Sequence, residues 1–414
     1  MTESTAAPVS GGEAMADVDK TVRRNAIVLT VATAFGGSLM PIAVALAGLA
    51  GSYLLATDKS LATVPVTALT VGSALATLPA AALMAKIGRR YGFMAGSLPA
   101  VIGGIVTCLA ILQSSFILFT FGCLLVGCSA AFVQQYRFAA VDGGSEVVRG
   151  KALGLVMGGG VLAAIVGPQT AIFTRDWFAP IPFAGAFLAI AALSLGNALV
   201  TSRLVDLQPA KGPVTEVPAE ARSLREIARQ PRFVAAVLCA MSSYALMSLV
   251  MTAAPLAMVG CGLTQDDAAL GIQWHVLAMF APSFFTGRLI ARFGKDRIVI
   301  AGMALLSACA VVSMTGLSLT HFWGALVLLG IGWNFGFMGA TAMLTETYLP
   351  QEKGKVQGLN DFLVFTTSAL SSLAAGLLIN GPGWSFINSI VFPVAILCLA
   401  ALAWTTLIGS RRAG

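Results

Sequence analysis

The sequence AKIGRR at residues 85–90 lies between two long apolar runs, and a near copy, ARFGKD, lies between two further apolar runs at residues 291–296, an offset of 206. A second pair of loop sequences, RGKALGL at residues 149–155 and KGKVQGL at residues 353–359, is offset by 204. Two independent matches at nearly one offset indicate that the chain contains two related halves. Each copied loop is basic and interrupts apolar sequence, which is typical of connectors between membrane-spanning helices.

The composition is that of a membrane protein. Of the 414 residues, 57% are hydrophobic and 10% are charged, and the mean hydropathy is +0.87. Soluble domains carry roughly 25% charged residues, so a single soluble core is excluded. The net charge of +7 does not indicate nucleic-acid binding, because the basic residues lie in short loops between apolar runs and not on a soluble face.

A bilayer core of about 30 Å requires roughly 20 apolar residues per spanning helix. Twelve apolar runs of about this length occur in the chain, in two groups of six. They cover residues 26–54, 61–85, 93–112, 116–141, 152–173 and 180–202, and then residues 233–259, 268–290, 298–318, 322–345, 356–379 and 385–408. The sequence therefore predicts an all-α membrane protein with twelve transmembrane helices in two pseudo-symmetric six-helix bundles.

The remaining segments complete the predicted organisation. Residues 1–25 are polar and predict a disordered cytoplasmic tail, followed by an N-terminal bundle over residues 26–202. Residues 203–232 contain four prolines and charges of both signs and predict a cytoplasmic linker, in which residues 223–230 suit a short amphipathic surface helix. The C-terminal bundle is expected over residues 233–414.

The basic residues also predict the orientation of the chain. Of the 25 Lys and Arg, Lys59 and Arg175 fall in loops that alternate counting places outside, and Arg137 falls within a span. The other 22 lie in the tails, in the loops of one side or, in the case of Arg288, at the end of the span 268–290 next to such a loop. By the positive-inside rule both termini are cytoplasmic, in what we expect to be the inner membrane of a bacterium.

At the copied loops the chain resembles the major facilitator superfamily, whose signature after span 2 is Gly-x-x-x-Asp-(Arg/Lys)-x-Gly-Arg-(Arg/Lys). The residues that match it are Lys86, Gly88, Arg89 and Arg90 in the first copy and Gly287, Arg292, Gly294 and Lys295 in the second. The family's acidic residue before the next basic loop is matched by Asp142 and Glu346. The signature Asp is replaced by Ala85 and Ala291, which puts the usual energetics of the gate in doubt.

Charges at the cytoplasmic ends of the spans form a candidate gate. Basic residues after span 2 are placed to meet Asp142, and those after span 8 are placed to meet Glu346. We hypothesise that these pairs hold the cytoplasmic face shut and so favour an outward-open state; the alternative is that they only anchor helix ends and set the topology. The candidate gating residues are Lys86, Arg89, Arg90, Asp142, Arg149, Arg292, Lys295, Glu346 and Lys353.

Three ionisable residues inside predicted spans are candidates for substrate binding or ion coupling, since a charge at this depth costs at least about 2.5 to 3.5 kcal/mol. Arg137, close to Gln134, suits binding of a solute or anion, or its side chain reaches the cytoplasmic surface. Asp361 is a candidate proton site, or it is a partner for a basic loop residue. His275 is able to titrate near neutral pH, or it is a buried packing residue.

In proteins that this chain resembles, spans 1, 4, 7 and 10 line a central cavity. Here these spans contain Tyr244, Trp333 and Asn334. Aromatic rings beside an amide suit a flat organic molecule that forms hydrogen bonds, and the alternative is that they only fill the core.

The resemblance implies a secondary active transporter that works by alternating access on a small organic solute. The stretch from Gln273 through Gly287 is similar to that of a bacterial group that includes riboflavin importers, which favours uptake of riboflavin or a similar vitamin. A glycine-rich segment at residues 158–160, followed by Gly167-Pro168, resembles a degenerate form of the family's antiporter motif and favours the alternative of a proton-coupled drug or metabolite efflux antiporter. Loss of both signature aspartates favours a third reading, a solute sensor that does not transport.

No enzymatic motif is present, because the sequence has no pairing of nucleophile and base and no phosphate-binding loop. The seven cysteines include no CxxC pair, so neither a metal site nor a cofactor is expected. The expected partners are a small-molecule substrate, protons as the coupling ion and the lipid bilayer, with no nucleic acid and with the chain as a monomer.

Overall fold

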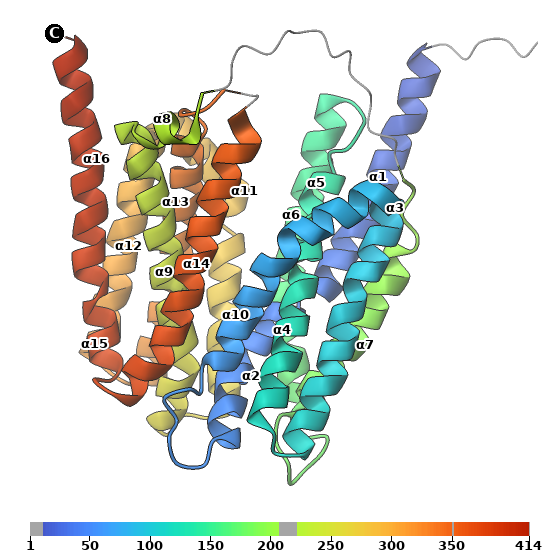
Figure 1. The fold of residues 1–414 in the computed structure, drawn as a ribbon, viewed down its shortest axis with the longest axis vertical. Helices are drawn as coiled ribbons and strands as arrows, with labels where there is room; N and C mark the ends of the chain where they lie inside the picture. The colour runs from blue at the N-terminus through green and yellow to red at the C-terminus, as the bar shows by residue number, and fades with distance from the viewer. Residues whose placement is uncertain (1–10, 207–221, 350–351, 414) are drawn as a thin grey trace, which may run out of the picture.

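The computed structural model describes residues 11–206, 222–349 and 352–413, and within these ranges the regular structure is helical (Figure 1). The first half contains α1 (Gly11–Gly36), α2 (Leu39–Leu54), α3 (Val64–Leu112), α4 (Phe116–Val133), α5 (Tyr136–Ala139), α6 (Glu146–Thr174) and α7 (Ala184–Thr201). The second half contains α8 (Leu224–Ala228), α9 (Pro231–Gly260), α10 (Gln265–Phe280), α11 (Ser283–Phe293), α12 (Lys295–Thr315), α13 (Leu319–Leu344), α14 (Lys353–Asn380), α15 (Trp384–Ser389) and α16 (Val391–Ala413). The predicted all-α class is confirmed.

The helices have the length and composition of membrane spans. In the described part of the chain, ten helical segments are long and apolar enough to cross a membrane, and α10 with α11, bent by 42°, supply an eleventh. The 49 residues of α3 amount to about 74 Å of helix at 1.5 Å per residue, more than twice the thickness of a bilayer core. Its helical conformation is interrupted at Gly88. Its length and this break fit the two separate spans predicted over residues 61–85 and 93–112, and the total of twelve spans stays a prediction.

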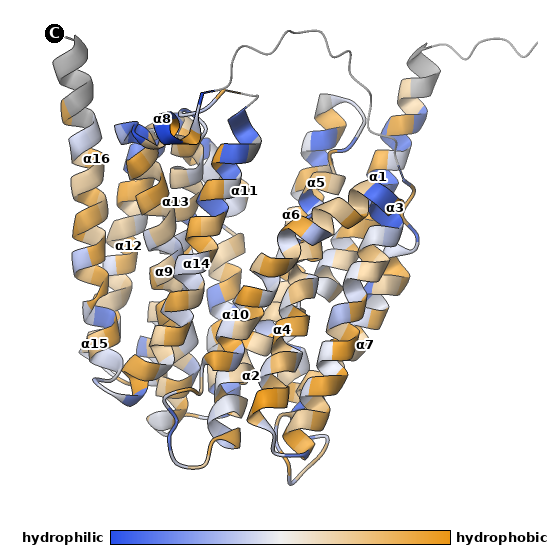
Figure 2. Cartoon of the chain, viewed as in Figure 1, coloured by the Kyte–Doolittle hydropathy of each residue, from blue (hydrophilic) through white to orange (hydrophobic). Residues whose placement is uncertain are grey.

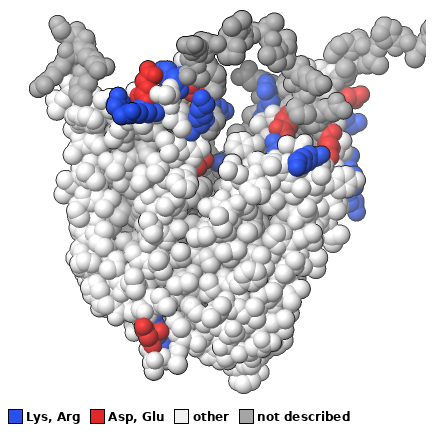
Figure 3. Space-filling model, viewed as in Figure 1, with Lys and Arg blue, Asp and Glu red and all other residues white. Residues whose placement is uncertain are grey.

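The two halves lie side by side and separate toward one end of the molecule (Figure 1). At that end α1 begins and α16 ends, and hydrophilic residues gather there (Figure 2). Figure 3 shows Lys and Arg side chains over the same end, with a hollow between the halves. We call this end the basic face and the other end the opposite face.

The opposite face is closed by contacts between the halves. Thr63, just before α3, donates a hydrogen bond from its hydroxyl to the carbonyl of Leu373 at 3.4 Å. Helix α10 of the second half also joins the core of the first half, since its residues Ala269, Ile272 and Val276 belong to one buried cluster with α2, α4 and α7. The structure is therefore open at the basic face and closed at the opposite face.

The sequence repeat is visible in the backbone. Gly88 has φ 83° and ψ 167°, and Gly294, between α11 and α12, has φ 88° and ψ 155°. Both values of φ lie where residues other than glycine are strained. Beside Gly88, a carboxylate oxygen of Asp206 accepts a hydrogen bond from the backbone N–H of Arg90 at 2.9 Å, and a Cβ on Gly88 would lie 2.8 Å from the other oxygen. The repeated glycines thus form equivalent sharp breaks.

The amino-terminal segment differs from the expectation. The sequence predicts a disordered tail over residues 1–25, whereas α1 already begins at Gly11; residues 1–10 lie outside the described ranges. The carboxylate of Asp19 accepts hydrogen bonds from the backbone N–H and the hydroxyl of Ser145 at 2.7 and 2.9 Å. The polar composition of this segment therefore serves contacts with a loop at the basic face.

The described parts of the linker contain one short helix. The hydroxyl of Ser223 caps α8 by accepting a hydrogen bond from the backbone N–H of Glu226 at 3.2 Å. This confirms the short helix predicted within residues 223–230, while residues 207–221 of the linker lie outside the described ranges.

Candidate functional site

Two opposite charges, one from each half, lie near the same tyrosine. Arg137 belongs to α5 and Asp361 to α14. The two side chains are exposed, interact electrostatically with each other and both act on the hydroxyl of Tyr244 in α9. Each half of the molecule thus contributes one of the two charges. Figure 3 shows acidic and basic side-chain atoms inside the hollow.

Each of the two charges also has a local partner. The guanidinium of Arg137 lies over the ring of Phe138 at 4.8 Å from its centroid, and the carboxylate of Asp361 accepts a hydrogen bond from the Asn360 side chain at 3.1 Å. Among the described residues, neither charge takes part in a direct ion pair. Both charges therefore remain available to a ligand.

Tyr244 is the centre of an aromatic cluster from α9, α13 and α14. Its ring meets Trp333, Phe337 and Phe365 edge to face, with centroids 5.5, 5.3 and 5.6 Å away. Trp333 and Phe337 are stacked with their planes 12° apart, and such pairs contribute about 0.5–1.5 kcal/mol each beyond area burial. The indole Nε1 of Trp333 is buried without a hydrogen-bond partner among the described residues. The cluster thus combines a rigid aromatic surface with a free N–H donor.

Gln134 lies one turn before Arg137, at the end of α4. Its side-chain nitrogen donates a hydrogen bond to the hydroxyl of Ser73 in α3 at 3.3 Å. The residue is exposed. This bond fixes the amide close to Arg137.

Asn334 lies elsewhere and has a structural environment. Its side chain is 1% exposed and accepts a hydrogen bond from the hydroxyl of Thr286 at 2.6 Å. Its nitrogen donates to the carbonyl of Met279 and to the hydroxyl of Ser283, both at 2.8 Å. Asn334 therefore ties α13 to the bend between α10 and α11 and has no polar group left over for a ligand.

His275 is also separate from the charged pair. It is fully buried in α10, and its Nδ1 lies 2.9 Å from the carbonyl oxygen of Leu326 in α13, so Nδ1 carries a proton and donates it to this hydrogen bond. Its Nε2 has no partner among the described residues. This placement is that of a packing residue between two helices of one half.

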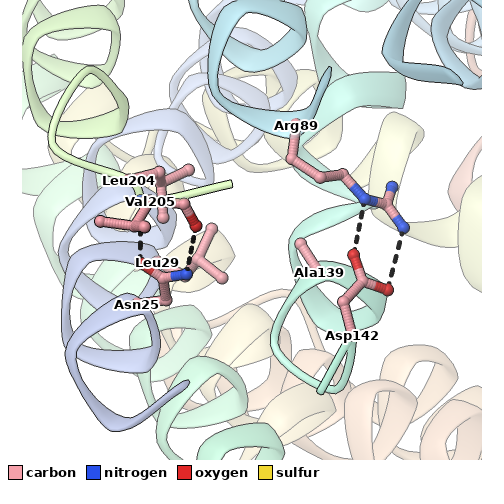
Figure 4. Close-up of a pocket in the computed structure, with 7 residues that line it drawn as sticks. All are labelled: Asn25, Leu29, Arg89, Ala139, Asp142, Leu204 and Val205. Atoms are coloured by element: carbon pink, nitrogen blue, oxygen red, sulfur yellow. Dashed lines mark hydrogen bonds and ion pairs between the residues drawn. The ribbon is translucent and has the colours of Figure 1, made fainter. Parts of the chain in front are cut away.

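Arg89 and Asp142 form the gate pair of the first half (Figure 4). The guanidinium nitrogens Nε and Nη2 lie 2.8 and 3.3 Å from the two carboxylate oxygens. A cavity of about 10 Å³, the size of a single water, lies beside the pair. Behind it, the side chain of Asn25 forms hydrogen bonds with the backbone N–H and carbonyl of Val205. The pair thus braces α3 against the loop that follows α5.

Lys295 and Glu346 form the corresponding pair of the second half, with Nζ and Oε1 2.7 Å apart. Arg232 joins them at 2.9 Å from the other oxygen of Glu346 and also contacts Asp296 at 2.7 Å. Burial raises the pKa of the Glu346 carboxyl, but the hydrogen bonds from Lys295 and Arg232 outweigh that effect and hold the pKa below its usual value.

The other candidate gating residues lie apart from these pairs. Arg90 is held through its backbone, and its guanidinium lies over the ring of Tyr91 at 5.4 Å. In the ranges that the structure covers, no ion pair involves Lys86, Arg149, Arg292 or Lys353.

The ion pairs of the candidate gate stay within one half. The pair Arg89–Asp142 lies in the first half and the pair Lys295–Glu346 in the second, and both are intact while the basic face is open. They brace the individual halves in this arrangement. From the sequence we expected these residues to hold the basic face shut. For that role, the basic residues of one half would have to form ion pairs with the acidic residues of the other half.

The contacts that join the halves escaped the sequence analysis. The guanidinium of Arg175 lies 2.6 Å from the carboxylate of Asp266, and the side chain of Gln169 in α6 donates to that of Gln273 in α10 at 2.9 Å. The sequence does contain one indication of the ion pair. Arg175 is one of only two basic residues in the loops assigned to the outside.

The linker is fixed to the second half by Arg222. Its backbone N–H and guanidinium donate three hydrogen bonds to the buried carboxylate of Glu352 at 2.7 to 3.0 Å. The Glu352 carboxylate also accepts from the backbone N–H of Leu349 at 2.9 Å. The bonds from Arg222 and then from Leu349 lower the pKa of Glu352 to about 2. No motif marks these residues in the sequence.

Comparison with known proteins extends these observations. The chain is 49% identical over 380 residues to the riboflavin transporter RfnT of Brucella anthropi, with 92% of this chain and 95% of that protein covered. It is 28% identical to the uncharacterized MFS-type transporter YddS of Bacillus subtilis, over 91% and 89% of the two chains.

Two solved structures share the fold. The nucleoside transporter NupG matches with a TM-score of 0.67 at 11% identity and covers 92% of this chain and 99% of its own. An auto-inhibited peptide transporter of the POT family matches with a TM-score of 0.65 at 14% identity, over 94% and 97%. The family model of the Major Facilitator Superfamily matches residues 26–273 and 236–413, so that both halves are included. With the duplicated helical halves described above, these matches establish that the chain belongs to the major facilitator superfamily.

Proposed function

We propose that this chain is a secondary active transporter that takes up riboflavin, or a vitamin with a similar flat heterocycle, across the bacterial inner membrane. The observation that carries the proposal is the aromatic cluster around Tyr244, whose central hydroxyl interacts electrostatically with Arg137 and Asp361 from opposite halves. A planar ring with carbonyl acceptors suits a rigid aromatic surface beside a guanidinium and the free N–H of Trp333. The name of the relative with 49% identity, a riboflavin transporter, favours the same substrate.

Alternating access supplies the transport step. The basic face is the cytoplasmic side in this proposal, with both termini there and the chain acting as a monomer in the lipid bilayer. The structure then corresponds to the state open to the cytoplasm, and closure of the basic face with opening of the opposite face gives the other state. The candidate gating residues would exchange their partners during this change.

Asp361 is the proposed coupling residue. A carboxylate inside a span favours protonation unless a charge or hydrogen bond stabilises its ionised form, and Arg137 across the hollow provides that charge. A solute bound between the two halves would weaken this interaction and so link its own binding to a proton.

Uptake in a riboflavin-auxotrophic bacterium tests the proposed substrate and direction. Expression of the wild-type chain should restore growth at low external riboflavin, and right-side-out vesicles should accumulate riboflavin. Trp333→Ala should reduce uptake at least tenfold at equal protein level, because it removes the stacked ring and the N–H donor. Trp404→Ala is the matched control, since Trp404 is an exposed tryptophan on α16 and should retain uptake.

The alternatives give different results in the same assays. Accumulation only in everted vesicles driven by a proton gradient would replace uptake with efflux. Binding of riboflavin without counterflow in proteoliposomes would replace transport with sensing. Growth rescue that persists fully in Trp333→Ala would remove the aromatic cluster from the proposed site.

A further inference from the structure

A second cavity lies at the opposite face, on the boundary between the halves. Its volume is about 700 Å³, within the roughly 300–1,000 Å³ of small-molecule sites. The first half contributes Tyr53, Lys59 and Phe183 to its walls, and the second half contributes Asn380 and Trp384. We propose that this cavity is an outer docking site at which a flat heterocycle with carbonyl acceptors binds before it crosses the membrane. The inference rests on the proposed function and concerns a place separate from the aromatic cluster around Tyr244.

The side chains of the cavity suit such a molecule. The rings of Tyr53 and Phe183 meet edge to face with centroids 6.2 Å apart, and Tyr53 is 49% exposed, so that a flat ring can lie against it. The ammonium of Lys59 donates to the carbonyl of Ser52 at 3.0 Å. Because an ammonium has three N–H donors, two remain for acceptors on a ligand.

Lys59 supplies the charge of the cavity. It is one of two basic residues in the loops of this face, and the other, Arg175, is held in ion pairs with Asp176 and Asp266. The cavity therefore presents a single positive charge beside aromatic rings. This combination favours a ligand with electron-rich carbonyl groups over a cation.

The docking site is also connected to the closure of this face. The backbone carbonyl of Lys59 accepts a hydrogen bond from the side chain of Asn380, in α14 of the other half, at 3.0 Å, and both residues line the cavity. A molecule in the cavity thus touches groups that must separate when the opposite face opens. Substitution of the Lys59 side chain leaves its carbonyl in place, so recognition of the ligand can be tested apart from closure.

Riboflavin transport measured from each side of the membrane tests the proposal. In right-side-out vesicles, Tyr53→Ala and Lys59→Met should each raise the KM for riboflavin at least fivefold and leave Vmax within twofold of wild type. In inside-out vesicles the KM for counterflow should stay unchanged, because the solute then binds from the basic face. Lys59→Arg should restore most of the affinity, since it keeps a positive donor. Phe386→Ala is the control, because Phe386 is exposed on α15, next to the cavity residues Trp384 and Ser385, and does not line the cavity.

The remaining outcomes overturn the proposal in distinguishable ways. An unchanged KM in both variants, with normal wild-type uptake, refutes the docking site and leaves the proposed function intact. An equal loss of transport from both sides shows that the residues support the fold and not recognition, and it also refutes the docking site. Absence of riboflavin transport by the wild type itself refutes the proposed function, and the docking site with it.

Discussion

Arg175 and Asp266 join the two halves of the molecule across its opposite face, with Nη1 and Oδ1 2.6 Å apart. Arg175 lies in the loop between α6 and α7, and Asp266 lies in the first turn of α10. Together with the bond from Gln169 to Gln273, this ion pair holds the face closed. At the basic face, by contrast, none of the ion pairs among the described residues joins one half to the other. Arg89–Asp142 lies within the first half, and the remaining pairs lie within the second half and its linker.

Loss of this ion pair should shift the protein toward the state open at the opposite face. Asp266→Ala should change the balance of the two states about fivefold, since a partly exposed ion pair contributes about 1 kcal/mol. Spin labels at positions 177 and 386, one on each half at this face, would report the change as a longer distance. Asp58→Asn serves as control, because Asp58 is a carboxylate of the same face that contacts Ser60 of its own half. Reversal of both charges, Arg175→Asp with Asp266→Arg, should restore the wild-type distance.

Loss of the ion pairs Arg89–Asp142 and Lys295–Glu346 at the basic face should affect both transport and stability. Asp142→Asn and Glu346→Gln should each slow transport severalfold and reduce stability by about 1 kcal/mol or less, because both carboxylates are partly exposed. Transport rate and thermal unfolding of the purified protein would separate the two effects. Asp17→Asn, at an exposed acid of α1, should change neither quantity. Normal transport and normal accessibility from both sides in the two variants would exclude a gating role.

Neutralisation of Asp361 should separate coupling from binding. Asp361→Asn should abolish accumulation of solute driven by a pH gradient and leave counterflow of solute against solute above half of the wild-type rate. Proteoliposomes with and without an imposed gradient provide the measurement. Retained gradient-driven accumulation would move the proton site to another residue.

Asn334 should matter for stability. Asn334→Ala removes the partner of the Met279 carbonyl and leaves the buried hydroxyl of Thr286 with the carbonyl of Pro282 alone, and a buried unsatisfied group costs about 1–3 kcal/mol. The melting temperature in detergent should therefore fall by several degrees. Ser307→Ala is the matched control, since Ser307 donates only within its own helix. An unchanged melting temperature would return Asn334 to the list of ligand-binding candidates.

The contact between Arg222 and Glu352 should weaken at acidic pH. Since the pKa of Glu352 is lowered from its usual 4.5 to about 2 in the folded protein, the contact contributes fully above pH 4.5 and loses its contribution as the pH falls from 4.5 through 2. The protection factors of the backbone amides of residues 222–230, which correct for the intrinsic pH dependence of exchange, should fall over this range. In Glu352→Gln the exchange should already be fast at neutral pH. Protection that does not change down to pH 2 would contradict the assignment.

The sequence predicted those features that depend on hydropathy or on the repeat. Gly88 and Gly294 were found by their fixed offset, and each indeed forms a break with positive φ. The approach of Arg89 to Asp142 followed from the ends of two neighbouring spans. Such features are local or duplicated, so they can be predicted from a single sequence.

Contacts between distant segments were harder to predict. Asn334 was a candidate for ligand binding because of its aromatic neighbours, but its partners lie in α10 and α11, about fifty residues earlier. The partners Arg222 and Glu352 are 130 residues apart and belong to no motif. Only the packing of the helices determines which polar side chains meet, and hydropathy carries no information about that packing.

The placement of Ala269, Ile272 and Val276 in the core of the first half has a thermodynamic consequence. Opening of the opposite face must separate α10 from that core and wet its apolar surface, and exposure of apolar surface to water raises the heat capacity. The free-energy difference between the two states should therefore depend on temperature in a curved and not a linear way. Because hydrophobic association weakens in the cold, cooling should populate the state that is open at the opposite face.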